Sequence, residues 1–423
     1  MSRLLVAVAA VAVSVAPARA QQPRVLDLGH GIYEAIGLAV GTGGQREVAT
    51  PASNTFLITT SAGNVVIDTS LATAAAAHKQ ALSAMSSAPI KAIILTHAHA
   101  DHTGGVNLWR GPDTVIVAHK ANADFVAYQL RLAGFYGRRN AAQFGGATPG
   151  AATARIAQSA PPAPTRTFDE RDGLTVGDVS FELLHTPGET PDHLTVWIPQ
   201  FKTAFIGDNY YGSFPNLYTL RGTPPRWALD YVESLDKVLA LEPELVLPSH
   251  GEPIRGRDEV KRRLTQYRDA IRHVHDATVA GMNAGKDVFT LMREIRLPPD
   301  LQIGESYGKL SWSVRGIYEG YVGWFDGNPS TMFGSPAEAY GDVVELAGGA
   351  DAIARRAADA IDRGDATRAL FLTDIALAAD PRHRRSLEAR LRALQRLDAA
   401  STNSNERGWL AAGIRDVEAR LKK

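Results

Sequence analysis

The chain of 423 residues contains no cysteine. This absence excludes disulfide bonds, cysteine metal ligands and a thiol nucleophile. Stability must therefore come from the size of the hydrophobic core and from any metal that the chain binds. If the protein does bind metal, histidine, aspartate and glutamate are the ligand types that remain.

An excess of charge of either sign is also missing, because 45 basic residues balance 45 acidic ones. This balance gives no support to nucleic acid or an anionic membrane surface as a partner. Hydrophobic residues make up 45% of the chain, an ordinary share for a soluble protein with a core. The length suggests two or three domains.

The first twenty residues differ from the rest of the chain. An arginine near the start precedes an apolar stretch from Leu4 to Val15, and Ala18, Arg19 and Ala20 form a candidate cleavage site. This pattern is typical of a secretory signal peptide and is too short for a membrane span. We expect cleavage after Ala20, a periplasmic or secreted protein, and no stable membrane insertion.

From Arg24 to about His250, short β-type runs alternate with turn signals and helical stretches. FLITT and VVIDT, separated by a turn, predict a hairpin, and AIIL, TVIVAH, FELLHT, LTVWIP, TAFIG and ELVLPSH predict further strands. The mixture predicts a layered α/β sandwich. Residues 141–166 are rich in Ala, Gly and Pro, which predicts a long surface loop near the substrate entrance.

Beyond His250 the pattern becomes helical. Apolar residues recur at three- and four-residue steps in a stretch that begins near Val260, which predicts an amphipathic helix. From Pro336 onward the chain is rich in Ala, Leu and Arg, and residues 350–381 predict a helical hairpin of the tetratricopeptide kind with Gly364 in its turn. One such hairpin cannot bury its apolar faces alone, so we expect it to pack on neighbours or on a second subunit.

The stretch THAHADHTGG directly follows a predicted strand and concentrates ligand-type side chains. Histidine is scarce elsewhere, with 12 in the whole chain. In a loop, His97 and His99 can converge on one cation, and Asp101 and His102 can face a second cation nearby. The similar HVHD stretch, at His273 and His275, lies within a predicted helix, where positions two apart point in different directions. We assign that stretch to helix packing.

Further ligands are expected from later strand ends, because zinc takes about four ligands. Glu189 follows a Pro-Gly turn, Asp208 follows a strand that ends at a glycine, and His250 lies between a strand and a turn. Together with the histidine cluster they provide two ligand sets. Asp68, at the end of VVIDT, is expected to accept a hydrogen bond from the free ring nitrogen of a ligand histidine.

HAHADH, TPGETPD, GD and SHG resemble the metallo-β-lactamase superfamily in order and approximate spacing. The resemblance implies an αββα sandwich in which His97 and His99 bind one metal and Asp101 and His102 bind another. Asp208 would bridge the two metals and His250 would complete the second site. Most members have histidine at the position of Glu189. Two such cations can share a hydroxide at neutral pH, and Asp101 could also orient it.

The segment that follows Asp208 indicates the substrate. Arg221, in NLYTLRG, could bind two oxygens of a tetrahedral anion through its guanidinium, or it could satisfy loop carbonyls instead. The segment resembles the alkylsulfatase family, as do GRRNAAQFG, YRDAIRHVHD, YVGWFDGNP and VELAGGAD. That family also has glutamate at the position of Glu189. The resemblance implies that Arg221 binds sulfate, that Asn216 and Tyr218 help to shape its pocket, and that the helical region forms a dimer.

The sequence therefore predicts residues 21–257 as a catalytic α/β domain and 258–423 as an all-α dimerisation domain. The predicted function is hydrolysis of alkyl or aryl sulfate monoesters to an alcohol and sulfate by hydroxide bound to two zinc ions. Asp101 and Arg221 would be catalytic. Iron or manganese would also suit these ligands. Tyr210, Tyr211 and Arg226 lie near the site, but none of them is singled out as the general acid.

Two other functions are compatible with the sequence. A phosphoesterase or a lactonase could use the same dinuclear scaffold, since an arginine alone does not distinguish sulfate from phosphate. A non-enzymatic helical-repeat interaction protein would retain partner binding without metal, but the complete ligand set argues against it. The expected partner is a small sulfate ester, with no role for nucleic acid.

Overall fold

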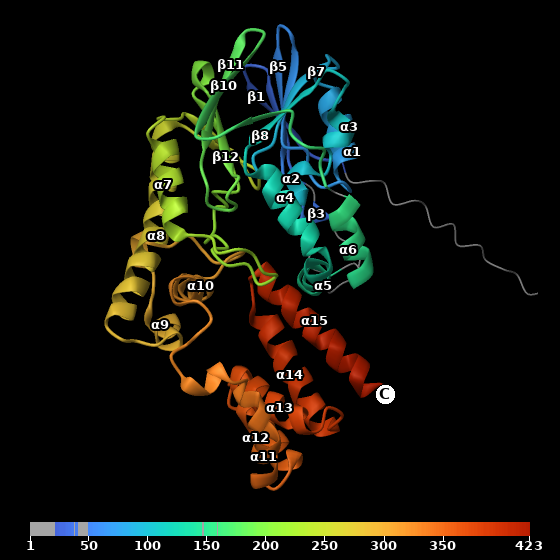
Figure 1. Ribbon diagram of the computed structural model, residues 1–423, viewed down its shortest axis with the longest axis vertical. Coiled ribbons are helices and arrows are strands. Elements are labelled where there is room, and N and C mark those ends of the chain that lie inside the picture. The colour runs from blue at the N-terminus through green and yellow to red at the C-terminus, as the bar shows by residue number, and fades with distance from the viewer. Residues whose placement is uncertain (1–21, 38, 41–49, 146–147, 159) are drawn as a thin grey trace, which may run out of the picture.

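The computed structural model describes residues 22–37, 39–40, 50–145, 148–158 and 160–423. Two β-sheets pack face to face, helices cover their outer faces, and a helical region extends away from one end of the sandwich (Figure 1). The prediction of an αββα sandwich followed by helices is confirmed. The predicted signal peptide, residues 1–20, lies outside the described residues.

The first sheet has seven strands in the order β1-β2-β5-β6-β7-β8-β9. Neighbouring strands are antiparallel from β1 to β6 and parallel from β6 to β9. The bounds are β1 Val25–Gly29, β2 Ile32–Ala35, β5 Thr55–Thr60, β6 Gly63–Ile67, β7 Ile90–Ile94, β8 Val115–His119 and β9 Arg166–Phe168. Two short strands, β3 Ala39–Val40 and β4 Thr50–Pro51, pair separately.

The second sheet has six strands in the order β10-β11-β12-β13-β14-β15. All neighbours are antiparallel except β13 and β14, which are parallel. It follows that β11, β13 and β14 point in the same direction. The bounds are β10 Arg171–Val176, β11 Val179–His185, β12 Leu194–Ile198, β13 Thr203–Gly207, β14 Leu245–Pro248 and β15 Ile254–Arg255.

Strand side chains alternate between two cores, as the two-residue repeat of a strand requires. Phe56 and Ile58 of β5 pack between the sheets against residues such as Phe205, whereas Leu57 points to the outer face. That outer face is covered by α1 (Ala75–Ser83) and by the one-turn helix α3 (Val106–Trp109), which follows another one-turn helix, α2 (Ala100–Thr103). Both faces of the first sheet are therefore buried.

The second sheet is covered by α7 (Ala228–Leu239) and the long helix α8 (Arg257–Asn283). Tyr231 of α7 and Leu264 of α8 belong to one buried cluster with Val246 of β14. The amphipathic helix that the sequence predicts from Val260 onward is therefore α8. Its apolar face packs against the sandwich, so the helical region and the sandwich share a core.

Residues 141–166 differ from the prediction of a long loop. Three helices lie here and just before: α4 (Asn122–Arg131), α5 (Ala133–Phe144) and α6 (Pro149–Gln158). Alanine favours a helix, and Pro149 is the first residue of α6, where a missing N–H has no cost. The side-chain oxygen of Thr148 accepts a hydrogen bond from the Ala151 N–H at the start of α6. Among the described residues of this segment, Gly145, Thr148 and residues 160–165 lie outside helices and strands.

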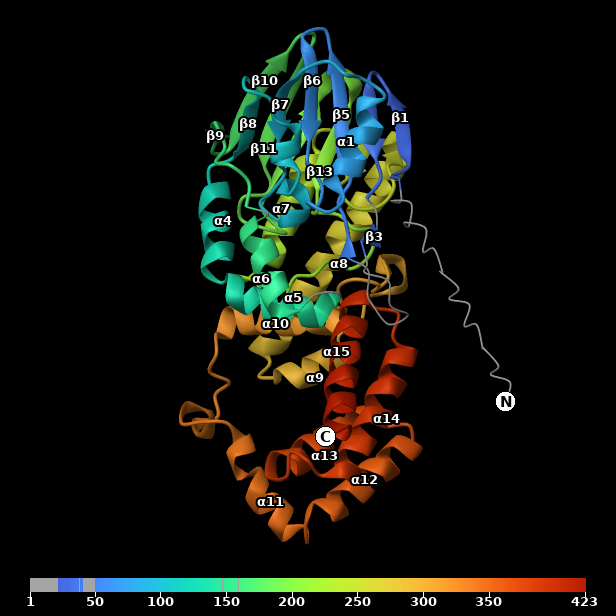
Figure 2. The same ribbon diagram turned by 90° about the vertical axis from the view of Figure 1, so that its right-hand side faces the viewer.

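The remaining helices form the region that extends from the sandwich, and α11 lies at the end farthest from it (Figure 2). The predicted helical hairpin is formed by α12 and α13, with Gly364 at φ +89° in its turn. It packs against α14, so a neighbouring helix within the chain covers one apolar face. The bounds are α9 Val288–Glu294, α10 Leu310–Val322, α11 Tyr340–Leu346, α12 Ala350–Asp362, α13 Ala366–Ala379, α14 Arg384–Ala400 and α15 Ser404–Leu421. No helix in the described part of the chain is both long and apolar enough to cross a bilayer.

A buried polar contact joins the first sheet to the loop that follows β14. The Asn54 side chain donates to Glu34 Oε1 (2.7 Å) and to the carbonyls of Pro248 (3.1 Å) and Gly251 (3.0 Å). Glu34 is fully buried, and its Oε2 has no partner among the described residues. Burial, assisted by Glu252, raises the pKa of Glu34 to about 8. The folded protein therefore holds Glu34 protonated at neutral pH.

We expect Glu34→Gln to flatten the dependence of stability on pH. Between the ordinary glutamate range and pH 8, folded Glu34 binds a proton that the unfolded chain releases, so the free energy of unfolding falls as pH rises. The glutamine can still accept from Asn54 but cannot ionise, and its advantage at pH 8 should be on the order of a few kcal/mol. Urea unfolding at a series of pH values measures this, with Glu182→Gln, whose side chain is 45% exposed, as the control.

Candidate metal centre

The strands that lead to the predicted ligands end at one edge of the sandwich. Asp68 follows β6 and His97 follows β7, which run parallel. Asp208 and His250 follow β13 and β14, and Glu189 lies in the loop that follows β11, which points the same way. Because strands of one direction end at one edge, side chains far apart in sequence meet there.

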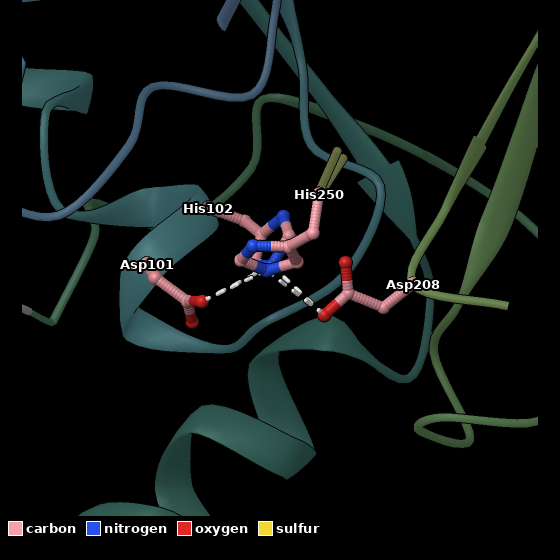
Figure 3. Close-up of side chains that lie close together, drawn as sticks. All are labelled: Asp101, His102, Asp208 and His250. Carbon is pink, nitrogen blue, oxygen red and sulfur yellow. Dashed lines mark ion pairs between the residues drawn. The ribbon is translucent and has the colours of Figure 1, made fainter. Parts of the chain in front are cut away.

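Four of the predicted metal ligands converge. Figure 3 shows Asp101, His102, Asp208 and His250 pointing toward one another. Asp208 Oδ2 lies 3.3 Å from His102 Nε2 and 3.4 Å from His250 Nε2. Asp101 Oδ2 lies 3.6 Å and 3.3 Å from the same two nitrogens. Ligand atoms about 2.0–2.1 Å from a tetrahedral metal ion lie about 3.3–3.4 Å apart, so this spacing fits a metal ion.

A second group shares Asp208 with the first and contains His97 and His99. His97 Nε2 lies 2.9 Å from His99 Nδ1 and 3.8 Å from Asp208 Oδ2. Glu189 Oε1 approaches this group to 3.7 Å from His99 Nδ1. The structure thus brings together all seven predicted ligand side chains, with Asp208 between the two groups.

Two buried ligand atoms lack hydrogen-bond partners among the described residues, namely His102 Nε2 and Asp208 Oδ1. A buried polar atom without a partner costs free energy, so such atoms usually mark a bound ion or water. Both atoms belong to the cluster that has metal-ligand spacing. The donor set therefore fits a pair of divalent metal ions.

The histidines of the cluster differ in their protonation: His97 and His99 form one pair, and His102 and His250 the other. Burial lowers the pKa of His97 and of His99 well below the ordinary value, and Arg221 adds to this effect at His99. Both rings are therefore neutral, the form in which histidine binds metal.

At His102 and His250 burial also disfavours the charged ring, but the carboxylates of Asp208 and Asp101 outweigh it. They raise the pKa of His102, and they raise the pKa of His250 to about 10. These carboxylates stabilise positive charge at this point, and metal ions would supply that charge in place of the protons.

Asp68 lies directly behind the cluster. Its Oδ2 lies 2.7 Å from His102 Nδ1 and accepts a hydrogen bond from the Ser249 hydroxyl (2.9 Å), and its Oδ1 accepts from the Thr96 N–H (2.9 Å). A hydrogen bond to Nδ1 directs Nε2 of the same ring toward the cluster. The backbone of Asp68 is left-handed at φ +54°, a conformation that aspartate tolerates better than most residues. Asp68 therefore lies where the sequence predicts it, beside a ligand histidine.

Glu189 is held by residues of two other elements. Its Oε2 accepts hydrogen bonds from the Arg226 guanidinium and from the Tyr231 hydroxyl (2.8 Å), and all three side chains are buried. Because Oε2 is occupied, Oε1 is the atom that faces His99. Arg226, a candidate general acid from the sequence, is therefore committed to Glu189.

Two residues that the sequence analysis did not assign also support the centre. His193 Nε2 accepts a hydrogen bond from the Asp208 N–H (3.1 Å), and the Tyr211 hydroxyl donates to Asp208 Oδ2 (2.9 Å). His193 lies within the HTPGETPDH stretch. A histidine that follows the Glu189 turn and precedes β12 was a signal that could have identified it. No local pattern marked Tyr211 above Tyr210, which packs against Tyr267 instead.

A cavity of about 680 Å³ opens onto the metal centre. His99, Asp101, Asp208, Glu189 and His250 lie at one end of it, and apolar side chains of α4, α5 and α6 form much of its wall. This size suits a small-molecule ligand. The helices found in place of the predicted loop thus lie beside the substrate space.

The three predicted substrate contacts lie in different surroundings. Arg221 lines the cavity, and its Nη2 lies 3.3 Å from His99 Nε2. Asn216 is buried outside the cavity lining, and neither atom of its side-chain amide has a partner among the described residues. Tyr218 is 40% exposed and packs near Gly316 of α10, also outside the lining. Of the three, only Arg221 lines the cavity beside the metal ligands.

The HVHD stretch lies on α8 and its two histidines face different neighbours. His273 Nε2 lies 3.0 Å from the Arg296 carbonyl, and His275 Nε2 lies 2.8 Å from the Tyr321 hydroxyl. Neither belongs to a group with metal-ligand spacing among the described residues. They take part in helix packing, as the helical spacing predicts.

Two family models match the chain. Residues 49–250 match the metallo-beta-lactamase superfamily, and residues 290–419 match the alkyl sulfatase dimerisation family. These matches confirm the resemblance to both families that the sequence motifs show.

Named relatives and a solved structure agree with this match. A linear primary-alkylsulfatase of Pseudomonas sp. (strain ATCC 19151) is 33% identical over 362 residues, which cover 80% of this chain and 69% of the relative. The alkyl/aryl-sulfatase BDS1 of Saccharomyces cerevisiae is 26% identical, covering 79% of this chain and 56% of the relative. The structure of the stereoselective inverting sec-alkylsulfatase Pisa1 from Pseudomonas sp. superposes with a TM-score of 0.82 at 25% identity, covering 93% of this chain and 65% of that chain.

This chain thus spans between 56% and 69% of the lengths of these three proteins. The similarity covers both the sandwich with its metal ligands and the helical region, and it extends to the fold of nearly the whole chain. The chain belongs to the alkylsulfatase family of the metallo-β-lactamase superfamily.

Proposed function

We propose that this protein hydrolyses organic sulfate monoesters, adding water to the ester to give an alcohol and sulfate. The observation that supports this most strongly is the position of Arg221, at the end of an apolar cavity that also contains the ligand cluster. A sulfate group bound there would contact the guanidinium while its organic part lies along the cavity. A phosphoesterase on the same scaffold is the alternative that the test below addresses.

The metal ions that we propose are zinc. Histidine and carboxylate ligands at tetrahedral spacing suit zinc, although iron and manganese accept the same ligand types. When bound, the two ions would make a water molecule more acidic and offset the negative charge of the sulfate ester. His97, His99 and Glu189 would hold one ion, Asp101, His102 and His250 the other, and Asp208 would contact both.

Side chains at the cavity end then bind the anion and handle protons. Arg221 presents a planar set of donors that can bind two sulfate oxygens at once. Asp101 lines the cavity, and His102 and His250 hold its pKa below the ordinary value against the effect of burial. Asp101 therefore stays ionised and can orient the attacking water by accepting a hydrogen bond from it. Of the three candidate proton donors, Tyr211 lines the cavity, but its hydroxyl already donates to Asp208 Oδ2, so none of the three is assigned as the donor to the leaving oxygen.

The organic part of the substrate is proposed to be aliphatic. The wall beside the metal centre includes Val126 and Leu130 of α4, Phe144 of α5 and Ile156 of α6. Each methylene group of a ligand that such a surface removes from water makes the free energy of binding more favourable. A linear or branched alkyl chain would fit this wall with no need for polar groups of its own.

Secretion and dimerisation complete the proposal. The apolar N-terminal stretch with its Ala18–Ala20 cleavage pattern supports export to the periplasm or beyond. For the homodimer, large apolar side chains in the helical region are exposed: Phe333 by 88%, Leu346 of α11 by 89% and Phe371 of α13 by 64%. Exposed apolar groups of this kind mark interaction surfaces. We propose that this part of the helical region contacts a second copy.

Replacing Arg221 tests the proposed reaction. Arg221→Ala should lower kcat/KM for an alkyl sulfate by about 10- to 100-fold, since charged hydrogen bonds contribute about 1.5–3 kcal/mol, and Arg221→Lys should restore only part of it. Sulfate release is measured with and without a chelator, and the exposed Arg171→Ala serves as the control. Chelation should abolish the activity. Turnover of a phosphate ester but of no sulfate ester would contradict the proposal.

Asp68→Asn tests the metal centre without removing a ligand. The amide keeps the shape of the side chain but loses the negative charge beside His102 Nδ1, so we expect metal affinity to fall by about 10- to 100-fold. Competition with a chelator, followed by elemental analysis, measures the affinity and identifies the metal. Asp178→Asn, at an exposed turn far from the centre, should retain the affinity of the original protein. Equal metal content in both variants under competition would argue against a role for Asp68.

Charged substitutions test the dimer surface. Phe333→Asp combined with Leu346→Asp should convert a dimer to a monomer, because two buried charges would face the partner without compensation. Light scattering coupled to size-exclusion chromatography gives the mass directly. Met85→Asp, at an exposed apolar position on the sandwich, should leave the mass unchanged. A protein that is monomeric before substitution would refute the proposed dimer.

A further inference from the structure

The cavity has two walls that come from distant parts of the chain. Helix α5 contributes Tyr136, Asn140 and Phe144 to its lining. The turn before α10 contributes Ser306 and Tyr307. The Tyr307 ring lies 5.0 Å from the ring of Tyr211, which contacts the metal ligand Asp208. A shift of either group of lining residues would change the shape of the space beside the metal centre.

The last helix of the chain, α15, contacts both walls. Figure 2 shows α15 rising from the helical region to lie beside α5, next to the sandwich, and the two helices pack together. Gly408 on α15 lies against α5 so closely that a Cβ atom there would be 1.7 Å from the Gln143 carbonyl oxygen. Only glycine allows this approach, since any side chain would displace one helix from the other.

A chain of hydrogen bonds runs from α15 through α5 and back to the turn. Trp409 Nε1 donates to Gln143 Oε1 (3.1 Å), Gln143 Nε2 donates to Asn405 Oδ1 (2.7 Å), and Asn405 Nδ2 donates to the Tyr307 carbonyl (3.0 Å). The tryptophan N–H can only donate, so it fixes the orientation of both amides. Gln143 and Asn405 are buried and both of their amide groups are paired.

Asn403 fastens the same turn to the start of α15. Its Nδ2 donates to the carbonyls of Glu305 (2.8 Å) and Tyr307 (2.9 Å), while its Oδ1 accepts from the Glu406 N–H (2.9 Å) and caps the helix. The Ser404 N–H donates to the Ser306 carbonyl (2.9 Å). The turn that carries Tyr307 thus has its backbone carbonyls bound by the first residues of α15.

We propose that α15 sets the width of the substrate cavity, and through it the length of alkyl chain that the enzyme accepts. Gln143, Asn405 and Gly408 are positioning residues: none of them lines the cavity, but each holds a wall that does. Loosening α15 would let the α5 wall move away from an alkyl chain while leaving the metal ligands in place. This inference rests on the proposed sulfatase function.

A matched pair of substitutions on the same helix tests it. Gly408→Ala must push α15 away from the α5 backbone, whereas at Gly413 an added Cβ would meet only the flexible end of Leu394, at 3.3 Å. Both changes equally favour the helical state. For Gly408→Ala we expect KM for dodecyl sulfate to rise about tenfold, because roughly two methylene groups of its alkyl chain would lose contact with the cavity wall. Its KM for butyl sulfate and its kcat should change little, and Gly413→Ala should match the original protein.

A second variant and a binding measurement complete the test. Gln143→Met keeps the volume but removes both amide hydrogen bonds, and it should show the same dependence on chain length if Gly408→Ala does not fold. Calorimetry with dodecanesulfonate, which has no ester bond to hydrolyse, reports the cavity without turnover. If no sulfate ester is hydrolysed but Gly408→Ala still weakens this binding, the proposed function fails and the role of α15 stands. Equal losses for short and long chains, or the same loss in Gly413→Ala, would overturn the role of α15.

Discussion

The interaction on which the centre depends is the contact of one carboxylate oxygen with three imidazoles. Oδ2 of Asp208 lies within 3.8 Å of a ring nitrogen of His97, His102 and His250. Without positive charge at this point, the carboxylates of Asp68, Glu189 and Asp208, which are all buried, and the partly buried carboxylate of Asp101 would repel one another. The protonated rings of His102 and His250 provide that charge here, and metal ions would provide it in the active protein. The buried acids and the metals therefore require each other.

The arrangement persists because the surrounding structure leaves the ligands little freedom. Asp208 follows a strand whose last residue, Gly207, adopts φ +52° and lies against the His193 ring. Glu189 is held by Arg226 and Tyr231, so one of its oxygens is directed at His99. The close packing of the sandwich core holds the strand ends in place. The ligand side chains are positioned because they follow these strand ends.

The helical region contributes to the cavity, and we propose that it also mediates assembly. Its first helix, α8, shares a core with the second sheet, and its last helix, α15, returns to contact the cavity walls. The same region exposes the apolar side chains proposed to contact a second copy. The proposed association and the proposed control of cavity shape would thus depend on one continuous set of packed helices, in which Asn403 contacts the turn that carries Tyr307 and Gly408 contacts α5.

The sequence by itself determined the ligand types, because the six residues from His97 to His102 and the strand-end positions of Asp208 and His250 are local patterns. It also predicted the strands from β5 to β8 and from β11 to β14, the α12–α13 hairpin and the family. The tertiary structure decided the rest. Residues 149–158 form a helix although Pro149 and Gly150 begin it, and Asn216 and Tyr218 lie outside the cavity that Arg221 lines. His193, Tyr211 and Asn405 act through contacts with residues distant in sequence. No local periodicity encodes such contacts, since they exist only once separate strands and helices have packed together.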